Sequence, residues 1–121
     1  MKKLLLASTA VAMIGGAAAA EDIKIGVILG FTGPIESLTP SMGDAAELAM
    51  AEVSASGKLL GGSTVSSVRA DSTCVDAGAA TTAAERLITS DGVKGIMGAD
   101  CSGVTGAILS NVALANGTVM I

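Results

Sequence analysis

The side chains best suited to chemistry in this sequence are two cysteines and the serine that follows the second of them. Cys74 and Cys101 are the only two cysteines, and Ser102 comes directly after Cys101. The N-terminus described below indicates export, and an even cysteine count in an exported chain favours a disulfide. Two free thiols remain the alternative. A metal site is disfavoured because the sequence contains no histidine and no closely spaced cysteine pair.

Ser102 stands at the start of an expected helix, directly after an expected strand. At that place its hydroxyl and the free backbone N–H groups of the first turn would form an anion site, which could hold a ligand carboxylate without Lys or Arg. The alternative is an ordinary N-cap serine, which stabilises a helix by about 1 kcal/mol. The residues alone leave both interpretations open.

Catalytic arrangements are poorly represented. There is no histidine, the usual base beside a Ser or Cys nucleophile. The glycines after the first expected strand do not have the dinucleotide-binding spacing, and no phosphate-binding GKS or GKT occurs. Asp71, Asp76 and Asp100 could form a carboxylate pair, but acids are common at strand ends and helix caps. We therefore expect a binding protein and not an enzyme, with no metal and no cofactor.

The elements that must position these residues alternate along the chain. Apolar, β-rich segments predict strands at 23–29, 64–70, 93–97 and 118–121, and amphipathic segments predict helices at about 40–56, 76–90 and 103–115. Thr39 is the expected N-cap of the first helix, with Pro40 in its first turn, and Asp76 is the expected N-cap of the second. This alternation predicts an α/β fold, a Rossmann-like parallel sheet with helices on both faces.

Ligands of open parallel sheets bind beyond the carboxyl ends of the strands. Three loops are expected at that edge, at 30–40, 71–75 and 98–102. The two cysteines lie in the second and third of these loops. A bridge between them would therefore join neighbouring strand ends beside the presumed site.

Residues 1–20 have the three-part pattern of a secretory signal peptide. Lys2 and Lys3 precede an apolar run over residues 4–14, and small residues lead to Ala20, after which we expect cleavage. An uncleaved anchor is the alternative, although the apolar run is about half the roughly twenty residues that a membrane span needs. The chain carries a net charge of −4 and no basic cluster, so nucleic acid is disfavoured as a partner.

The chain stops on the apolar residues 119–121, just after the turn residues Asn116 and Gly117. Domains seldom stop on a buried strand without any tail. We therefore expect the chain to be a fragment of a larger protein.

Four stretches of the sequence together resemble a known family. They are residues 23–28 with Thr32-Gly33-Pro34, residues 57–62, residues 71–74 and residues 96–105. In order and spacing they are similar to the N-terminal part of type I periplasmic binding proteins of the leucine/isoleucine/valine-binding group. The resemblance covers residues 22–121 and implies two Rossmann-like lobes that close on a ligand. It also implies that residues 21–121 are the incomplete N-terminal lobe.

The resemblance also implies site residues. Cys74 and Cys101 match the family's disulfide pair, and Ser102 matches the serine that helps to hold the ligand α-carboxylate. Cys101 beside it and Leu38 complete the expected ligand-binding set. Leu38 falls where family members often place an aromatic residue against the ligand side chain, so the leucine departs from the pattern.

The function implied by the resemblance is capture of a branched-chain or related amino acid in the periplasm. The protein would act as a monomer and deliver its ligand to an ABC permease in the inner membrane. The departure at Leu38 keeps amides, urea and aromatic acids open as ligands. A periplasmic ligand-sensing module that feeds a receptor is the alternative from another class.

Overall fold

The structure is a computed structural model that describes residues 19–121, so the expected signal peptide at 1–20 lies outside the described residues except for Ala19 and Ala20. The elements follow in the order β1 (Asp22–Leu29), α1 (Thr39–Ala55), β2 (Thr64–Asp71), α2 (Ala77–Thr89), β3 (Gly95–Gly98), α3 (Ser102–Ile108), the π-helix η1 (Leu109–Ala113), α4 (Leu114–Asn116) and β4 (Val119–Met120). The predicted alternation of strands and helices is confirmed, although β3 and β4 are shorter than expected.

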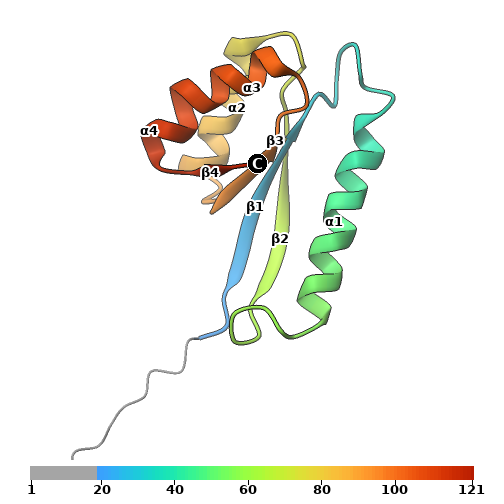
Figure 1. Cartoon of the computed structure of the whole chain (residues 1–121), viewed down its shortest axis with the longest axis vertical. Helices are drawn as coiled ribbons and strands as arrows, with labels where there is room; N and C mark the ends of the chain where they lie inside the picture. The colour runs from blue at the N-terminus through green and yellow to red at the C-terminus, as the bar shows by residue number, and fades with distance from the viewer. Residues whose placement is uncertain (1–18) are drawn as a thin grey trace, which may run out of the picture.

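The four strands form one sheet in the order β2-β1-β3-β4, and every neighbouring pair is parallel. Figure 1 shows α1 on one face of this sheet and α2, α3 and α4 on the other. β1 lies inside the sheet, between β2 and β3, and its residues Val27, Ile28 and Leu29 are buried. The nearly continuous apolar run of β1 is typical of such a strand.

The main hydrophobic core lies between the sheet and the layer that contains α2 and α3. Its buried members are Ile28, Ala70, Ala80, Ala84, Leu87, Val93, Ile96, Val104, Ile108 and Val112. A Cβ on Gly26 would lie 2.8 Å from Cδ1 of Leu87, so the glycine in β1 is what allows α2 to approach the sheet this closely.

The opposite face, beside α1, is less closely packed. Val53 of α1 is 44% exposed. Ala46, Ala49, Met50 and Val53 line an open apolar groove of about 430 Å³, together with Ile25, Val65, Met97 and Ile121. α1 is also bound to β2 by ion pairs of Arg69 with Asp44 and Glu47.

The expected cap of α1 is wrong. Thr39 is the first residue of the helix, Leu38 occupies the N-cap position, and no side chain caps the N-terminus. The Thr39 hydroxyl is buried and donates instead to the carbonyl of Gly30 at 2.8 Å. The hydroxyl thus binds a carbonyl outside the helix and does not cap the first turn. Pro40 lies in the first turn as expected.

The third helix is present but is not uniform. Its middle is a five-residue π-helix, Leu109–Ala113, in which both Val112 and Ala113 are buried. The wider turn of a π-helix allows these two adjacent residues to face the core, and no local sequence pattern predicts it. The helical segment ends at Gly117, which adopts φ +61° as the expected terminator.

Candidate functional site at the carboxyl edge of the sheet

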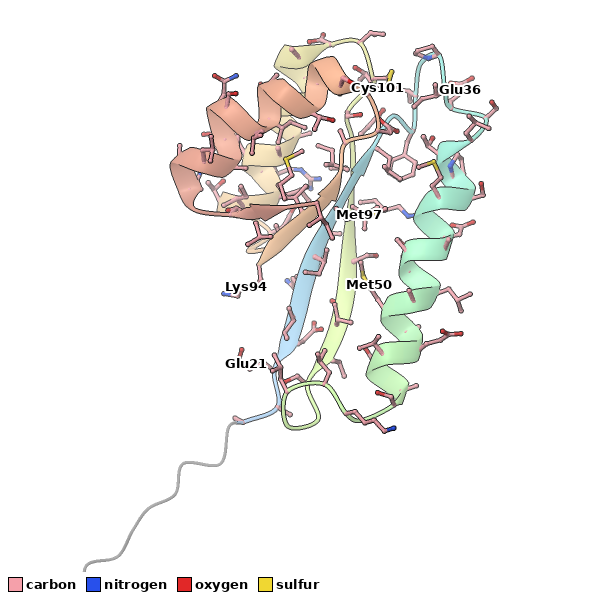
Figure 2. All side chains as sticks on the ribbon, viewed as in Figure 1. Glu21, Glu36, Met50, Lys94, Met97 and Cys101 are labelled. Carbon is pink, nitrogen blue, oxygen red and sulfur yellow. A yellow bond between two sulfur atoms is a disulfide. The ribbon has the colours of Figure 1, made fainter. Side chains whose placement is uncertain are left out.

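The carboxyl ends of β1, β2 and β3 meet at one edge of the sheet. The loops that follow them carry Leu38, Cys74 and Cys101, three of the predicted site residues. Figure 2 shows Cys101 and Glu36 at this end of the molecule, with Glu21 toward the opposite end. The predicted position of the site, beyond the carboxyl ends of parallel strands, thus corresponds to one continuous edge.

Cys74 and Cys101 form a disulfide, with their Cα atoms 5.3 Å apart and a sequence separation of 27. The predicted pairing is confirmed. The bridge joins the loop after β2 to the residue that precedes α3. In the sheet order β2-β1-β3-β4 these two strands are separated by β1, so the expectation that the bridge joins neighbouring strand ends is wrong. The bridge spans the end of β1 and restrains the start of α3 relative to the end of β2.

Ser102 is the first residue of α3, and Cys101 occupies the N-cap position with extended backbone angles of φ −110° and ψ 127°. No side chain caps this N-terminus, so the interpretation of Ser102 as an ordinary N-cap serine is wrong. Ser102 is exposed. The helix thus begins at the site edge with first-turn N–H groups that no side chain satisfies, an arrangement suited to an anion.

Asp100 connects the ends of three strands. One carboxylate oxygen, Oδ2, accepts a hydrogen bond from the backbone N–H of Gly30 at 2.8 Å. The other, Oδ1, accepts from the hydroxyl of buried Ser72 at 3.5 Å. The sequence drew attention to Asp100 only as a possible member of a catalytic carboxylate pair, and the structure shows it bound to the protein's own loops.

Asp71, the last residue of β2, binds both the loop after β1 and the loop after β2. Its Oδ1 accepts from the N–H of Thr73 at 2.8 Å and of Thr32 at 3.3 Å, and its Oδ2 accepts from the Thr32 hydroxyl at 2.5 Å. Burial raises the pKa of Asp71, but the hydrogen bonds from Thr32 and Thr73 outweigh it, so the pKa lies below its ordinary value. Asp71 is thus a bound carboxylate and not a free acid.

The third acid considered as part of a carboxylate pair, Asp76, has the structural role that the sequence predicted. It is the N-cap of α2, and its side chain accepts from the N–H of Ala79. Each of the three acids is thus bound by a different set of the protein's own groups.

The loop between β1 and α1 is held against the loop after β2. Gly33 adopts φ +97°, and a Cβ there would lie 2.6 Å from the carbonyl oxygen of Thr73. Only glycine fits this close approach. The loop ends at Leu38, which is 61% exposed at the N-terminus of α1.

Leu38 and Ser102 thus stand at the N-termini of helices on opposite faces of the sheet, both at its carboxyl edge (Figure 1). One supplies an exposed apolar side chain and the other a hydroxyl beside free N–H groups. The sequence did not reveal the bracing around them by Asp71 and Asp100.

Within residues 19–121, no cluster of three or more acidic or cysteine side chains has an arrangement that could hold a metal ion. None of the helices in this described part combines the length and apolar character needed to cross a bilayer.

Fold and site edge together define a ligand-binding protein built on a parallel α/β lobe. Residues 22–121 match the family model described as periplasmic binding protein, and the chain belongs to this family. Within the family it is a type I protein of the leucine/isoleucine/valine-binding group, as the sequence predicted.

Relatives support this assignment. The chain is 38% identical over 104 residues to the Leu/Ile/Val-binding protein homolog 7 of Brucella melitensis, which covers 85% of this chain and 25% of the relative. The structure of this chain resembles that of the branched-chain amino acid transporter substrate-binding protein LivJ of Streptococcus pneumoniae in complex with isoleucine. The TM-score is 0.73 and the sequence identity 26%, and the match covers 82% of this chain and 28% of LivJ. This chain also resembles the leucine-binding protein LivK of Thermotoga maritima, with TM-score 0.68 and 30% identity over 81% of this chain and 26% of that one. The chain thus spans about a quarter of the length of the curated relatives.

Proposed function

We propose that this chain forms the N-terminal wall of a solute-binding protein that captures a branched-chain or related amino acid for an ABC transporter. The observation that carries the proposal is the N-terminus of α3, which no side chain caps and which begins at Ser102 on the carboxyl edge of the sheet. On this proposal residues 21–121 are the incomplete first lobe, and a second lobe closes over the ligand. The similarity to LivJ and to the Brucella protein supports the choice of ligand class.

Binding on this proposal makes and breaks no covalent bond. The ligand α-carboxylate accepts hydrogen bonds from the Ser102 hydroxyl and from N–H groups of the first turn of α3, with the backbone of Cys101 beside it. Leu38 contacts the ligand side chain from the other face of the sheet. Binding energy then favours the closed arrangement of the lobes, which a membrane permease recognises.

Export belongs to the same proposal. We infer that residues 1–20 are a signal peptide removed after Ala20, which releases a monomeric protein into the periplasm. Ala19 and Ala20 are exposed and precede β1 without regular structure, so a peptidase could reach the bond. N-terminal sequencing of the protein recovered from the periplasm should begin at Glu21. A protein that keeps residues 1–20 would contradict this part of the proposal.

The ligand is tested by calorimetry on the protein expressed from its complete gene, with leucine, isoleucine and valine compared with amides, urea and aromatic acids. We expect saturable binding of at least one branched-chain amino acid. The variant Ser102→Ala should bind it about tenfold more weakly, since a hydrogen bond to a charged group is lost. Ser110→Ala, an exposed serine farther along the same helical segment, is the matched control and should bind normally.

Two results would contradict the proposal. The first is binding of only amides, urea or aromatic acids, which would move the protein to another ligand class. The second is normal affinity in Ser102→Ala, which would remove the N-terminus of α3 from the site. Uptake of the ligand by vesicles that contain the cognate permease, only when the protein is added, separates transport from a sensing role.

A further inference from the structure

We propose that Asp100 is a positioning residue that holds the start of α3 in register with the loop carrying Leu38. The inference rests on the proposed function, because the two segments that it aligns are the two sides of the proposed site. It assigns to Asp100 no contact with the ligand. Its effect on binding passes through Ser102 and through the loop at 30–38.

Asp100 connects all three strand ends of the site. Gly30 follows β1, Ser72 follows β2 and Asp100 itself follows β3, while the sheet order places β1 between the other two. The carboxylate accepts from the Gly30 N–H at 2.8 Å and from the Ser72 hydroxyl at 3.5 Å. One side chain therefore fixes the spacing between neighbouring loops on both sides of the central strand.

These contacts form part of a closed ring. The Ser72 oxygen that donates to Asp100 also accepts from the N–H of Cys74 at 3.4 Å. Cys74 is joined through its disulfide to Cys101, the residue next to Asp100. The ring thus combines one covalent bridge with one carboxylate bridge, and Ser102 follows directly from it. A shift of Asp100 would carry the first turn of α3 with it.

A carboxylate suits this position because it has two oxygens that accept hydrogen bonds independently. Alanine would leave the buried Gly30 N–H and the buried Ser72 hydroxyl without this acceptor. Asparagine keeps one acceptor oxygen and nearly the same volume, and it can still receive the Gly30 N–H. The series from Asp100 through Asn to Ala therefore weakens the bracing in two steps.

A matched control exists at the other end of the sheet. The carboxylate of Asp22 also bridges neighbouring strands, since it accepts from the hydroxyls of Thr64 at 3.3 Å and Ser66 at 3.1 Å. It does so at the amino end of β1, away from the proposed site. Asp22→Ala thus removes an inter-strand carboxylate of similar kind without disturbing the carboxyl edge.

The experiment uses the protein expressed from its complete gene, with L-isoleucine and L-isoleucinamide as probes. Asp100→Ala should bind L-isoleucine about tenfold more weakly than the wild type, and Asp100→Asn about threefold more weakly. The preference for the free carboxylate over the amide should fall in the same order, since the misplaced groups are those that meet the carboxylate. Asp22→Ala should keep both the affinity and the preference.

Amide hydrogen exchange without ligand provides the readout that does not depend on the proposed function. Exchange at Gly30 and in the first turn of α3 should be faster in Asp100→Ala than in the wild type and in Asp22→Ala. If the wild type binds neither probe while exchange at these two places is still faster in Asp100→Ala than in the wild type, the proposed ligand is wrong and the positioning role stands.

Equal affinity of the wild type and Asp100→Ala overturns the inference, as does an equal loss in Asp100→Ala and Asp22→Ala. Unchanged exchange at both places in Asp100→Ala overturns it as well. If Asp100→Ala does not fold, Asp100→Asn decides the matter. Wild-type exchange at Gly30 in that variant, together with wild-type preference for the carboxylate, rejects the positioning role.

Discussion

The guanidinium of Arg69 lies over the ring of Phe31, with its carbon 5.3 Å from the ring centroid. The same group binds Glu47 twice, from Nε to Oε1 at 2.7 Å and from Nη2 to Oε2 at 2.9 Å. Hydrogen bonds from Arg69 and Ser67 lower the pKa of Glu47. Arg69 of β2 therefore joins the loop after β1 to α1, and Phe31 is the only aromatic residue in the chain.

Replacement of Arg69 by Lys should lower the thermal unfolding midpoint. Lysine keeps the charge but cannot make two parallel hydrogen bonds to a carboxylate while it stacks on a ring. The matched control is Arg86→Lys, in which the native arginine pairs with Asp91 at 3.0 Å at the end of α2. The unfolding midpoint should fall less in Arg86→Lys than in Arg69→Lys. Equal melting curves for Arg69→Lys and the wild type would reject the bracing role of Arg69.

The stabilisation by Asp71 should depend on pH. Its pKa in the folded protein lies below its ordinary value, so the folded state binds the proton less readily than the unfolded state. Its contribution is therefore complete above about pH 4, the ordinary range of an aspartate, and is lost as the pH falls through the lower folded pKa. Denaturant unfolding should show a gap between the wild type and Asp71→Asn that narrows below about pH 4. A gap that stays constant down to about pH 2 would contradict the assignment.

Loss of the disulfide should destabilise the protein by about 3–4 kcal/mol, from the chain entropy of the loop that it closes. Urea unfolding of the wild type with and without reductant measures the difference. The double variant Cys74→Ala/Cys101→Ala should unfold like the reduced wild type and should not respond to reductant. In the folded, exported wild type neither thiol should react with a maleimide before reduction, and immediate labelling of both would exclude the bridge.

Truncation of Leu87 to alanine should cost about 2–5 kcal/mol of unfolding free energy. The side chain is fully buried against Gly26 in the face of the sheet that α2 covers. Leu48→Ala is the control, because Leu48 is 62% exposed on α1 and its loss should cost about 0.5 kcal/mol or less. Urea unfolding compares the two variants. Similar losses in both would mean that the core is not where the structure places it.

Much of the fold follows from the sequence because its elements are strongly patterned. The alternation of strands and helices, the cap at Asp76 and the terminator at Gly117 all rest on local rules, and all are confirmed. The prediction that Thr39 caps α1 is wrong because its hydroxyl can bind a group outside the helix instead of a backbone N–H of the first turn. The buried carbonyl of Gly30, which lies 9 positions away, is a tertiary acceptor that no local pattern reveals.

The site was predictable only in part, for the same physical reason. The position of Cys101 and Ser102 after a strand is a local feature. The pairing of Cys74 with Cys101 was favoured because they are the only two cysteines of a chain with a predicted export signal, and the resemblance implied the same pair. The hydrogen bond between Asp100 and Gly30 spans 70 positions. From the sequence alone Asp100 is only a polar loop residue, because its partner Gly30 becomes its neighbour through the pairing of β1 with β3. The bracing of the site is a product of topology and not of any motif.

The strand order also has a consequence for the growing chain. β1 is made first, yet both of its partners in the sheet, β2 and β3, are made later. Val27 and Ile28 pair with β2 on one side and with β3 on the other, so one side of this buried run stays unpaired until the residues up to Gly98 have been made. Exposed apolar segments make unfinished chains prone to aggregate. The nascent chain is therefore open to association from the synthesis of β1 until β3 is in place.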